Sequence, residues 1–220
     1  MKCKDVAVIG LGRFGSSLAR TLQSMGVAVL GVDLCEEHVN GLAGVLTETA
    51  IADITDVQVV QELGLRNFDH VVVAIGQNIA ASLMLTVMLK DLDVKHIIAK
   101  ASSDLHGKAL RLVGADQVVF PERDMGARLA KHLIAPNLLE FIELSPVHSL
   151  IELTVAGALV GKTLRQLDLR NKYSVNVIGL RSGQYCNLSP IADDMVKEGD
   201  ILVLVGETEG LERLQSDYGL

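Results

Sequence analysis

Residues 6–15 read Val6-Ala7-Val8-Ile9-Gly10-Leu11-Gly12-Arg13-Phe14-Gly15, a short apolar run followed at once by the spacing G-x-G-x-x-G. This pattern predicts the first strand, turn and helix of a dinucleotide-type domain. Gly10 permits the tight turn, Gly12 lets the backbone approach a phosphate, and Gly15 lets the helix pack closely on its strand. The start of that helix then offers unpaired N–H groups to an anion.

The next apolar run supplies the context that a lone glycine motif lacks. Val27 to Asp33 indicates a second buried strand that ends in an acid, about 20 residues after the motif, where an adenosine ribose presents its hydroxyls. The sequence therefore predicts a nucleotide site here. The alternative is a glycine-rich turn in an α/β fold that binds nothing.

The composition favours a globular protein with a buried sheet and argues against nucleic-acid binding. The 220 residues are 49% hydrophobic and 21% charged, which fits a sheet buried on both faces. A net charge of -7 and 3% aromatic residues predict neither a basic surface nor a stacking platform for bases. Cys3, Cys35 and Cys186 form no C-x-x-C pair and are expected to be free thiols in a reducing compartment.

One uncharged stretch, Val71 to Leu89, is about long enough to span a bilayer. Gly76-Gln77-Asn78 divides it into a β-branched run and a helical run, so a strand, a ligand-facing turn and a helix are expected instead. The N-terminus runs straight into an expected strand, and no secretory signal is visible.

Apolar runs alternate with helical stretches along the first 120 residues, which predicts an α/β fold with a Rossmann-like, doubly wound parallel sheet. The strands are expected at 6–9, 27–32, 45–52, 71–75, 96–99 and 117–120. The helices are expected at 14–25, 36–44, 56–63, 79–92 and 105–113.

A ligand of such a sheet lies at the carboxyl ends of the strands. The residues just after each strand are therefore the predicted binding residues: Gly10, Gly12, Arg13, Asp33, Leu34, Cys35, Asp53, Ile54, Ile75, Gly76, Gln77, Lys100, Ala101 and Ser102.

The chain after Pro121 predicts a connection and a second domain. A helix is expected to run to Ala135, and a further short helix over 138–144 after the break at Pro136-Asn137. We expect a nucleotide-binding domain at 1–135, a crossover or hinge at 136–149 and a small α+β lobe at 150–220. The alternative for the helix is ordinary packing on its own sheet. The lobe should contain strands at 151–155, 175–181 and 201–205 and helices at 163–169 and 209–214.

Four features together closely resemble the KtrA/TrkA family, the regulatory RCK proteins of bacterial potassium uptake systems, and its KtrA branch in particular. They are G-L-G-R-F-G at 10–15, the strand-terminal Asp33, P-E-R-D-M-G at 121–126, and E-G-D-I-L-V-L-V-G at 198–206. The resemblance covers essentially the whole chain and implies an RCK N-lobe, a crossover and an RCK C-lobe.

The resemblance also implies a function without catalysis. It implies a cytoplasmic octameric ring on the inner face of the membrane, docked on a membrane-embedded potassium-translocating subunit of the KtrB/TrkH type and reshaped by ATP against ADP. Some members of the family tolerate NAD(H). The alternative is an NAD-dependent oxidoreductase, but no His, Arg and Asp set on a credible pocket follows Pro121.

The resemblance implies which part of the nucleotide each of several residues would contact. Arg13 would reach the γ-phosphate of ATP, on its own or a neighbouring subunit, and Asp33 would hold the ribose. Asp53 and Ile54 would flank the adenine, and Ile75 to Gln77 with Lys100 to Ser102 would close the crevice. Phe14 and Gly15 of the glycine motif are expected to be cofactor-binding residues as well.

The resemblance also implies nucleotide-site roles for His106 and Glu122. His106 matches a position that touches the nucleotide, and Glu122 matches an acid that holds Mg²⁺ or Ca²⁺ near the phosphates. A carboxylate beside a triphosphate is repelled unless a cation lies between them. The alternatives are a solvated first-turn residue for Arg13, a helix-start acid for Glu122 and a surface histidine for His106. The other histidines, His38 among them, show no metal-ligand spacing.

The C-lobe leaves two interpretations open. Some relatives bind cyclic di-AMP between two C-lobes, and Arg170 to Tyr173 with Val175, Ile178 and Pro190 could line such a site. The same residues would also serve as a simple hydrophobic dimer contact with a polar rim, and no phosphate-binding loop is evident in this lobe.

Overall fold

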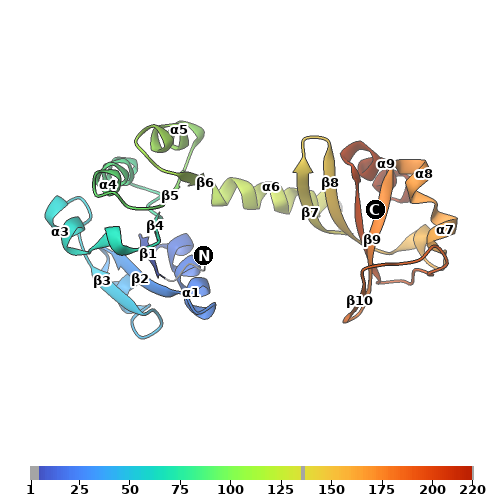
Figure 1. Ribbon diagram of the computed structural model, residues 1–220, viewed down its shortest axis with the longest axis horizontal. Coiled ribbons are helices and arrows are strands. Elements are labelled where there is room, and N and C mark those ends of the chain that lie inside the picture. Colours follow the sequence, from blue (N-terminus) through green and yellow to red (C-terminus); the bar gives the residue numbers. More distant parts are fainter. Residues whose placement is uncertain (1–4, 135–136, 220) are drawn as a thin grey trace. The chain divides into compact units, whose positions relative to one another are not determined.

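A computed structural model describes residues 5–134 and 137–219 of the chain. The chain divides into two compact units, Met1–Asp124 and Met125–Leu220, and each is described by itself (Figure 1). Cys3 and the residues expected to end the first helix of the connection, Ala135 and Pro136, lie outside the described residues.

The first unit is built on a parallel sheet of six strands in the order β3-β2-β1-β4-β5-β6, so the predicted Rossmann-like doubly wound fold is confirmed. The strands are β1 (Asp5–Ile9), β2 (Ala28–Asp33), β3 (Glu48–Ile51), β4 (His70–Val73), β5 (Ile97–Lys100) and β6 (Gln117–Val119). β1 lies at the centre and pairs in parallel with both β2 and β4.

Helices connect these strands, and the sheet is buried on both faces. They are α1 (Arg13–Ser24), α2 (Glu36–Asn40), α3 (Val57–Glu62), the 3₁₀ turn η1 (Leu65–Asn67), α4 (Ile79–Asp91) and α5 (Asp104–Leu112). Along β1, Ala7 and Ile9 belong to one apolar cluster, and Val6 and Val8 belong to another. Successive side chains of a strand point to opposite faces, so an uninterrupted apolar run suits a sheet covered on both sides.

The stretch from 71 to 89 forms a strand, a turn and a helix as predicted. β4 ends at Val73, and α4 begins after Asn78, whose side-chain oxygen accepts a hydrogen bond of 3.0 Å from the amide of Ala81. Within the described ranges, no helix is both long enough and apolar enough to cross a bilayer.

The helix α6 (Pro121–Ile134) contains the division between the two units, which falls after Asp124. The second unit is an antiparallel sheet in the order β10-β9-β11-β8-β7 with short helices. Its elements are β7 (Leu138–Ser145), β8 (His148–Thr154), η2 (Gly157–Leu159), α7 (Leu164–Leu167), α8 (Leu169–Tyr173), β9 (Val175–Ser182), β10 (Tyr185–Asn187), β11 (Ile201–Glu207) and α9 (Thr208–Tyr218).

The prediction of a short helix over 138–144 is wrong, because these residues form β7 and pair antiparallel with β8. The sequence L-L-E-F-I-E-L suits a helical period as well as a strand, so its own pattern does not decide between them. Pairing with β8 decides it, and Leu138 and Phe141 then pack against the core of the second unit. Residues 138–145, expected in the crossover, are therefore part of a sheet.

Tyr173 is a buried tyrosine of this core. Its hydroxyl donates a hydrogen bond of 2.9 Å to Oδ2 of Asp217 on α9, and only 7% of the residue is exposed. Burial raises the pKa of Tyr173 to about 12, and the hydrogen bond to Asp217 adds to the effect. A tyrosine in the unfolded chain titrates near 10, so the folded state resists losing this proton.

We expect this tyrosine to make stability fall at alkaline pH. Its contribution to the free energy of unfolding is complete below about pH 10 and is lost as the pH rises towards about 12, because the unfolded chain then binds fewer protons than the folded one. Urea unfolding at several pH values should show a steeper fall in this window for the wild type than for Tyr173→Phe. The control is Tyr185→Phe at an exposed tyrosine, which should keep the wild-type slope. Equal slopes for wild type and Tyr173→Phe would contradict this assignment.

Candidate functional site

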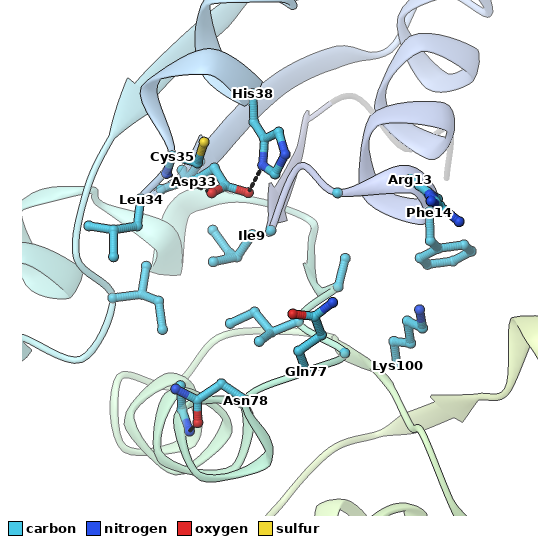
Figure 2. Close-up of a pocket in the computed structure, with 18 of the residues that line it drawn as sticks. Ile9, Arg13, Phe14, Asp33, Leu34, Cys35, His38, Gln77, Asn78 and Lys100 are labelled. Atoms are coloured by element: carbon cyan, nitrogen blue, oxygen red, sulfur yellow. Dashed lines mark hydrogen bonds and ion pairs between the residues drawn. The ribbon is translucent and has the colours of Figure 1, made fainter.

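A cavity of about 1200 Å³ opens at the carboxyl ends of the strands of the first unit (Figure 2). Its walls come from the turns after β1, β2, β3, β4 and β5 and from the start of α6. The lining residues are Ile9, Gly10, Gly12, Arg13, Phe14, Val32, Asp33, Leu34, Cys35, His38, Ala52, Asp53, Ile54, Thr55, Ala74, Ile75, Gly76, Gln77, Asn78, Ala81, Lys100, Ser102 and Glu122.

The glycine turn forms one wall and depends on missing side chains. Gly10 has a φ of +98°, and its amide donates a hydrogen bond of 2.7 Å to the carbonyl of Val32. A Cβ at Gly15 would lie 1.8 Å from the carbonyl oxygen of Gly10, so only glycine lets α1 come this close to the turn. Gly12 precedes α1 without a side-chain cap, and no acid occupies the first turn. The first amides of α1 therefore remain available to an anion.

Two cationic side chains lie near this wall. Arg13 is exposed, and its guanidinium makes no hydrogen bond or ion pair with any other residue that the structure describes. The ammonium of Lys100 lies 5.7 Å from the centre of the Phe14 ring, and Figure 2 shows the two side chains facing each other. These positive charges and the helix start favour a negatively charged ligand at this end of the cavity.

Lys100 is held by an ion pair with Glu122. Its Nζ donates to Oε1 of Glu122 at 2.5 Å, and the lysine side chain is 12% exposed while the glutamate is 70% exposed. The hydrogen bond from Lys100 lowers the pKa of Glu122. Lys100 passes close to Gly76, where a Cβ would lie only 3.3 Å from the lysine Nζ.

Asp33 ends β2 at the opposite end of the cavity, where Figure 2 shows it next to His38. Three donors hold its carboxylate. Oδ2 accepts a hydrogen bond of 2.6 Å from the amide of Leu11 and lies 3.2 Å from Nδ1 of His38. Oδ1 accepts a hydrogen bond of 2.8 Å from the amide of Cys35. The carboxylate is thereby fixed with 15% of its side chain exposed.

Asp53 follows β3 and is held by its own turn. Its Oδ1 accepts hydrogen bonds of 2.7 Å from the hydroxyl of Thr55 and 2.9 Å from the amide of Thr55. These hydrogen bonds lower the pKa of Asp53, the hydroxyl contributing most. Ile54 beside it is 9% exposed and offers an apolar wall.

Two domain families match the chain that forms this cavity. The TrkA-N domain matches residues 6–121, and the TrkA-C domain matches residues 150–218. The chain belongs to the KtrA/TrkA family. The resemblance drawn from the sequence motifs is thus confirmed, and the match spans both units.

Named relatives of this KtrA/TrkA protein are similar along nearly their full length. Ktr system potassium uptake protein C of Bacillus subtilis (strain 168) is 44% identical over 96% of either chain. Ktr system potassium uptake protein A of the same organism is 41% identical over 99% of this chain and 98% of its own. Among solved structures, the GsuK channel matches the whole chain with a TM-score of 0.72 at 23% identity, over 40% of its own length, which supports the fold.

The cavity of this KtrA/TrkA protein gathers all the predicted binding residues except Gly15, Ala101 and His106. Gly15 acts through packing, and Ala101 is 2% exposed within the core. His106 is 2% exposed and lies behind Ser102, with Nδ1 3.3 Å from the amide and 3.2 Å from the hydroxyl of that serine. Burial lowers the pKa of His106, which favours a neutral ring.

Sequence reasoning missed three polar lining residues, His38, Thr55 and Asn78. His38 was expected to be an ordinary residue, yet it pairs with Asp33. His38 follows the strand-terminal acid by five residues and lies in α2, but this spacing does not by itself show which way the side chain turns. Thr55 and Asn78 each hold a turn through a side-chain hydrogen bond.

Glu122 lies at the cavity but does not by itself make a cation site. Among the described residues, no three His, Cys, Asp or Glu side chains gather where they could hold a metal ion. Mg²⁺ commonly takes one or two carboxylates and completes its shell with water and substrate phosphates. The residues present therefore fit a divalent cation only when a phosphate supplies further oxygens.

Proposed function

We propose that this protein is a regulatory subunit of a potassium uptake system and that the cavity of its first unit senses an adenine nucleotide. The observation that carries the proposal is 44% identity over 96% of the chain to a Ktr system potassium uptake protein. The Vibrio alginolyticus Ktr system potassium uptake protein A, at 36% identity over 94% of the chain, supports the same role.

The cavity suits a nucleotide laid along the carboxyl ends of the strands. The phosphates would lie at the glycine turn and the start of α1, the ribose at Asp33, and the adenine beside Asp53 and Ile54. The GsuK channel, which shares this fold, has been solved bound to NAD and bound to ADP. An acid such as Asp33 disfavours a 2′-phosphate and so argues against NADP.

Arg13 and Glu122 would distinguish ATP from ADP. A ligand shifts a conformational equilibrium only by its difference in affinity for the two states. The guanidinium of Arg13 would pair with the γ-phosphate, and Glu122 would hold Mg²⁺ or Ca²⁺ against the phosphates. ADP would leave these contacts unmade. The difference between the two nucleotides would then favour different shapes of the assembly.

The proposal includes the assembly and its place in the cell. The protein would form an octameric ring in the cytoplasm, bound at the inner face of the membrane to a KtrB/TrkH-like potassium-translocating subunit. The C-lobe would contact the C-lobe of a second copy. That interface would either bind cyclic di-AMP or form without a ligand. No catalysis is proposed. NAD-dependent oxidation is the alternative, and turnover of a substrate with NAD would establish it.

Calorimetric titration with ATP, ADP, NADH and cyclic di-AMP, with and without Mg²⁺, tests the proposal. Arg13→Ala is expected to bring the ATP and ADP affinities together. The loss for ATP should be roughly tenfold to a hundredfold, the value of one charge-assisted contact. Arg111→Ala removes an exposed arginine outside the cavity and should leave both affinities unchanged. Glu122→Gln should abolish an effect of Mg²⁺ that is confined to ATP.

Two results would overturn this assignment. Strong NADH binding without ATP binding would favour the oxidoreductase. An Arg13→Ala variant that still prefers ATP by the wild-type margin would remove the proposed switch.

A further inference from the structure

The three hydrogen bonds to Asp33 leave little room for a ribose. A carboxylate has about four lone-pair sites, two on each oxygen. Oδ2 uses both of its sites, for the amide of Leu11 and for Nδ1 of His38. Oδ1 uses one site for the amide of Cys35. One site on Oδ1 therefore remains, whereas the 2′- and 3′-hydroxyls of a ribose together donate two hydrogen bonds.

Only one of the three donors is free to leave. The amide of Leu11 belongs to the glycine turn, and the amide of Cys35 immediately precedes α2, so the backbone fixes both. The His38 side chain is 47% exposed and lines the cavity, and its Nδ1 contact of 3.2 Å is the longest of the three. Since a carboxylate accepts and cannot donate, Nδ1 carries the proton in this contact. Among the described residues the ring makes no other hydrogen bond or ion pair, so rotation of His38 into solvent breaks only the contact with Asp33.

We infer that His38 competes with the nucleotide ribose for Asp33 and sets how strongly the site prefers a ribonucleotide over a 2′-deoxyribonucleotide. A ligand with both hydroxyls displaces His38 to reach Oδ2. A ligand with one hydroxyl uses the remaining site on Oδ1 and leaves His38 in place. His38 thus lowers the affinity for ribonucleotides selectively. The inference rests on the proposed binding of a nucleotide at Asp33.

The test compares ADP with 2′-deoxy-ADP, which carry the same base and phosphates, by calorimetry on the full chain. In His38→Ala, the affinity for ADP should rise about three- to tenfold, the value of one hydrogen bond that no longer has to be broken, while the affinity for 2′-deoxy-ADP stays the same. The matched control is Glu37→Ala, an exposed neighbour on α2 outside the cavity, which should leave both affinities unchanged. A merely structural role of His38 would shift both ligands equally.

The outcomes separate this inference from the proposed function. An unchanged or lower preference for ADP in His38→Ala overturns the competition. Asp33→Asn tests the site itself, because it should remove the wild-type preference for ADP. If Asp33→Asn keeps that preference, or if the wild type binds neither nucleotide, the ribose site fails and the competition fails with it.

Discussion

Gly15→Ala is expected to destabilise the first unit by about 3 kcal/mol or more. The new methyl group would lie 1.8 Å from the carbonyl oxygen of Gly10, so α1 must move away from the turn after β1. Urea unfolding should report the loss, and hydrogen exchange should show lower protection of the β1, β2 and β4 amides. The nucleotide site should be lost with it, because both of its phosphate-binding parts would move.

Gly12→Ala is the matched control in the same motif. A Cβ at Gly12 meets nothing within 4 Å, and its φ of -64° suits an alanine. Its stability should therefore stay within about 0.5 kcal/mol of the wild type. Gly12 lines the cavity, so any effect of the substitution should fall on phosphate binding. Wild-type stability in Gly15→Ala would show that the contact between α1 and the turn is not as close as described.

Gly210→Ala is expected to have a comparable effect on the second unit. Gly210 lies in α9, and a Cβ there would come within 2.0 Å of the carbonyl oxygen of Tyr173 at the end of α8. The expected loss is again about 3 kcal/mol or more, because backbone rather than a flexible side chain blocks the methyl group. Urea unfolding with hydrogen exchange of the β8 and β11 amides would measure it.

Gly126→Ala is the control for this second substitution. Gly126 lies inside α6, and a Cβ there meets nothing within 4 Å. An alanine in an open helical position should stabilise the helix by about 0.5–1 kcal/mol. The same chemical change should thus have opposite signs at two helical glycines. If both variants are stabilised, the packing of α9 against α8 is looser than the structure indicates.

The sheet of the first unit was predictable because its sequence signals are redundant. Most of the strands are apolar β-branched runs, β3 (Glu48–Ile51) being the exception, and the glycine motif marks where the sheet begins. The second unit was harder to predict. β7 has a pattern that also suits a helix, and β10 has only three residues. Both are defined by their partner strands, which lie elsewhere in the sequence.

The sequence could predict which residues follow the strands at the cavity, but not which way their side chains point. Parallel strands bring Asp33, Asp53 and Lys100 to one edge wherever their side chains point. Side-chain direction decides the rest. Sequence spacing cannot show that His38 turns back towards Asp33, or that His106 turns inwards behind Ser102.

The two strand orders differ in how much of the chain must be synthesised before each sheet can form. In the first unit the earliest strand, β1, lies at the centre and the latest, β6, lies at an edge, so the sheet can grow outwards as the chain is synthesised. In the second unit β11, the last strand, lies between β8 and β9 and joins them. That sheet cannot close until residue 207 has left the ribosome. At about 5–20 residues per second, the hairpin of β7 and β8 waits about 3–11 seconds for β11, and the hairpin of β9 and β10 waits about 1–4 seconds. The first unit can therefore be complete once residue 124 has left the ribosome, whereas the second unit stays in two pieces until β11 has left it.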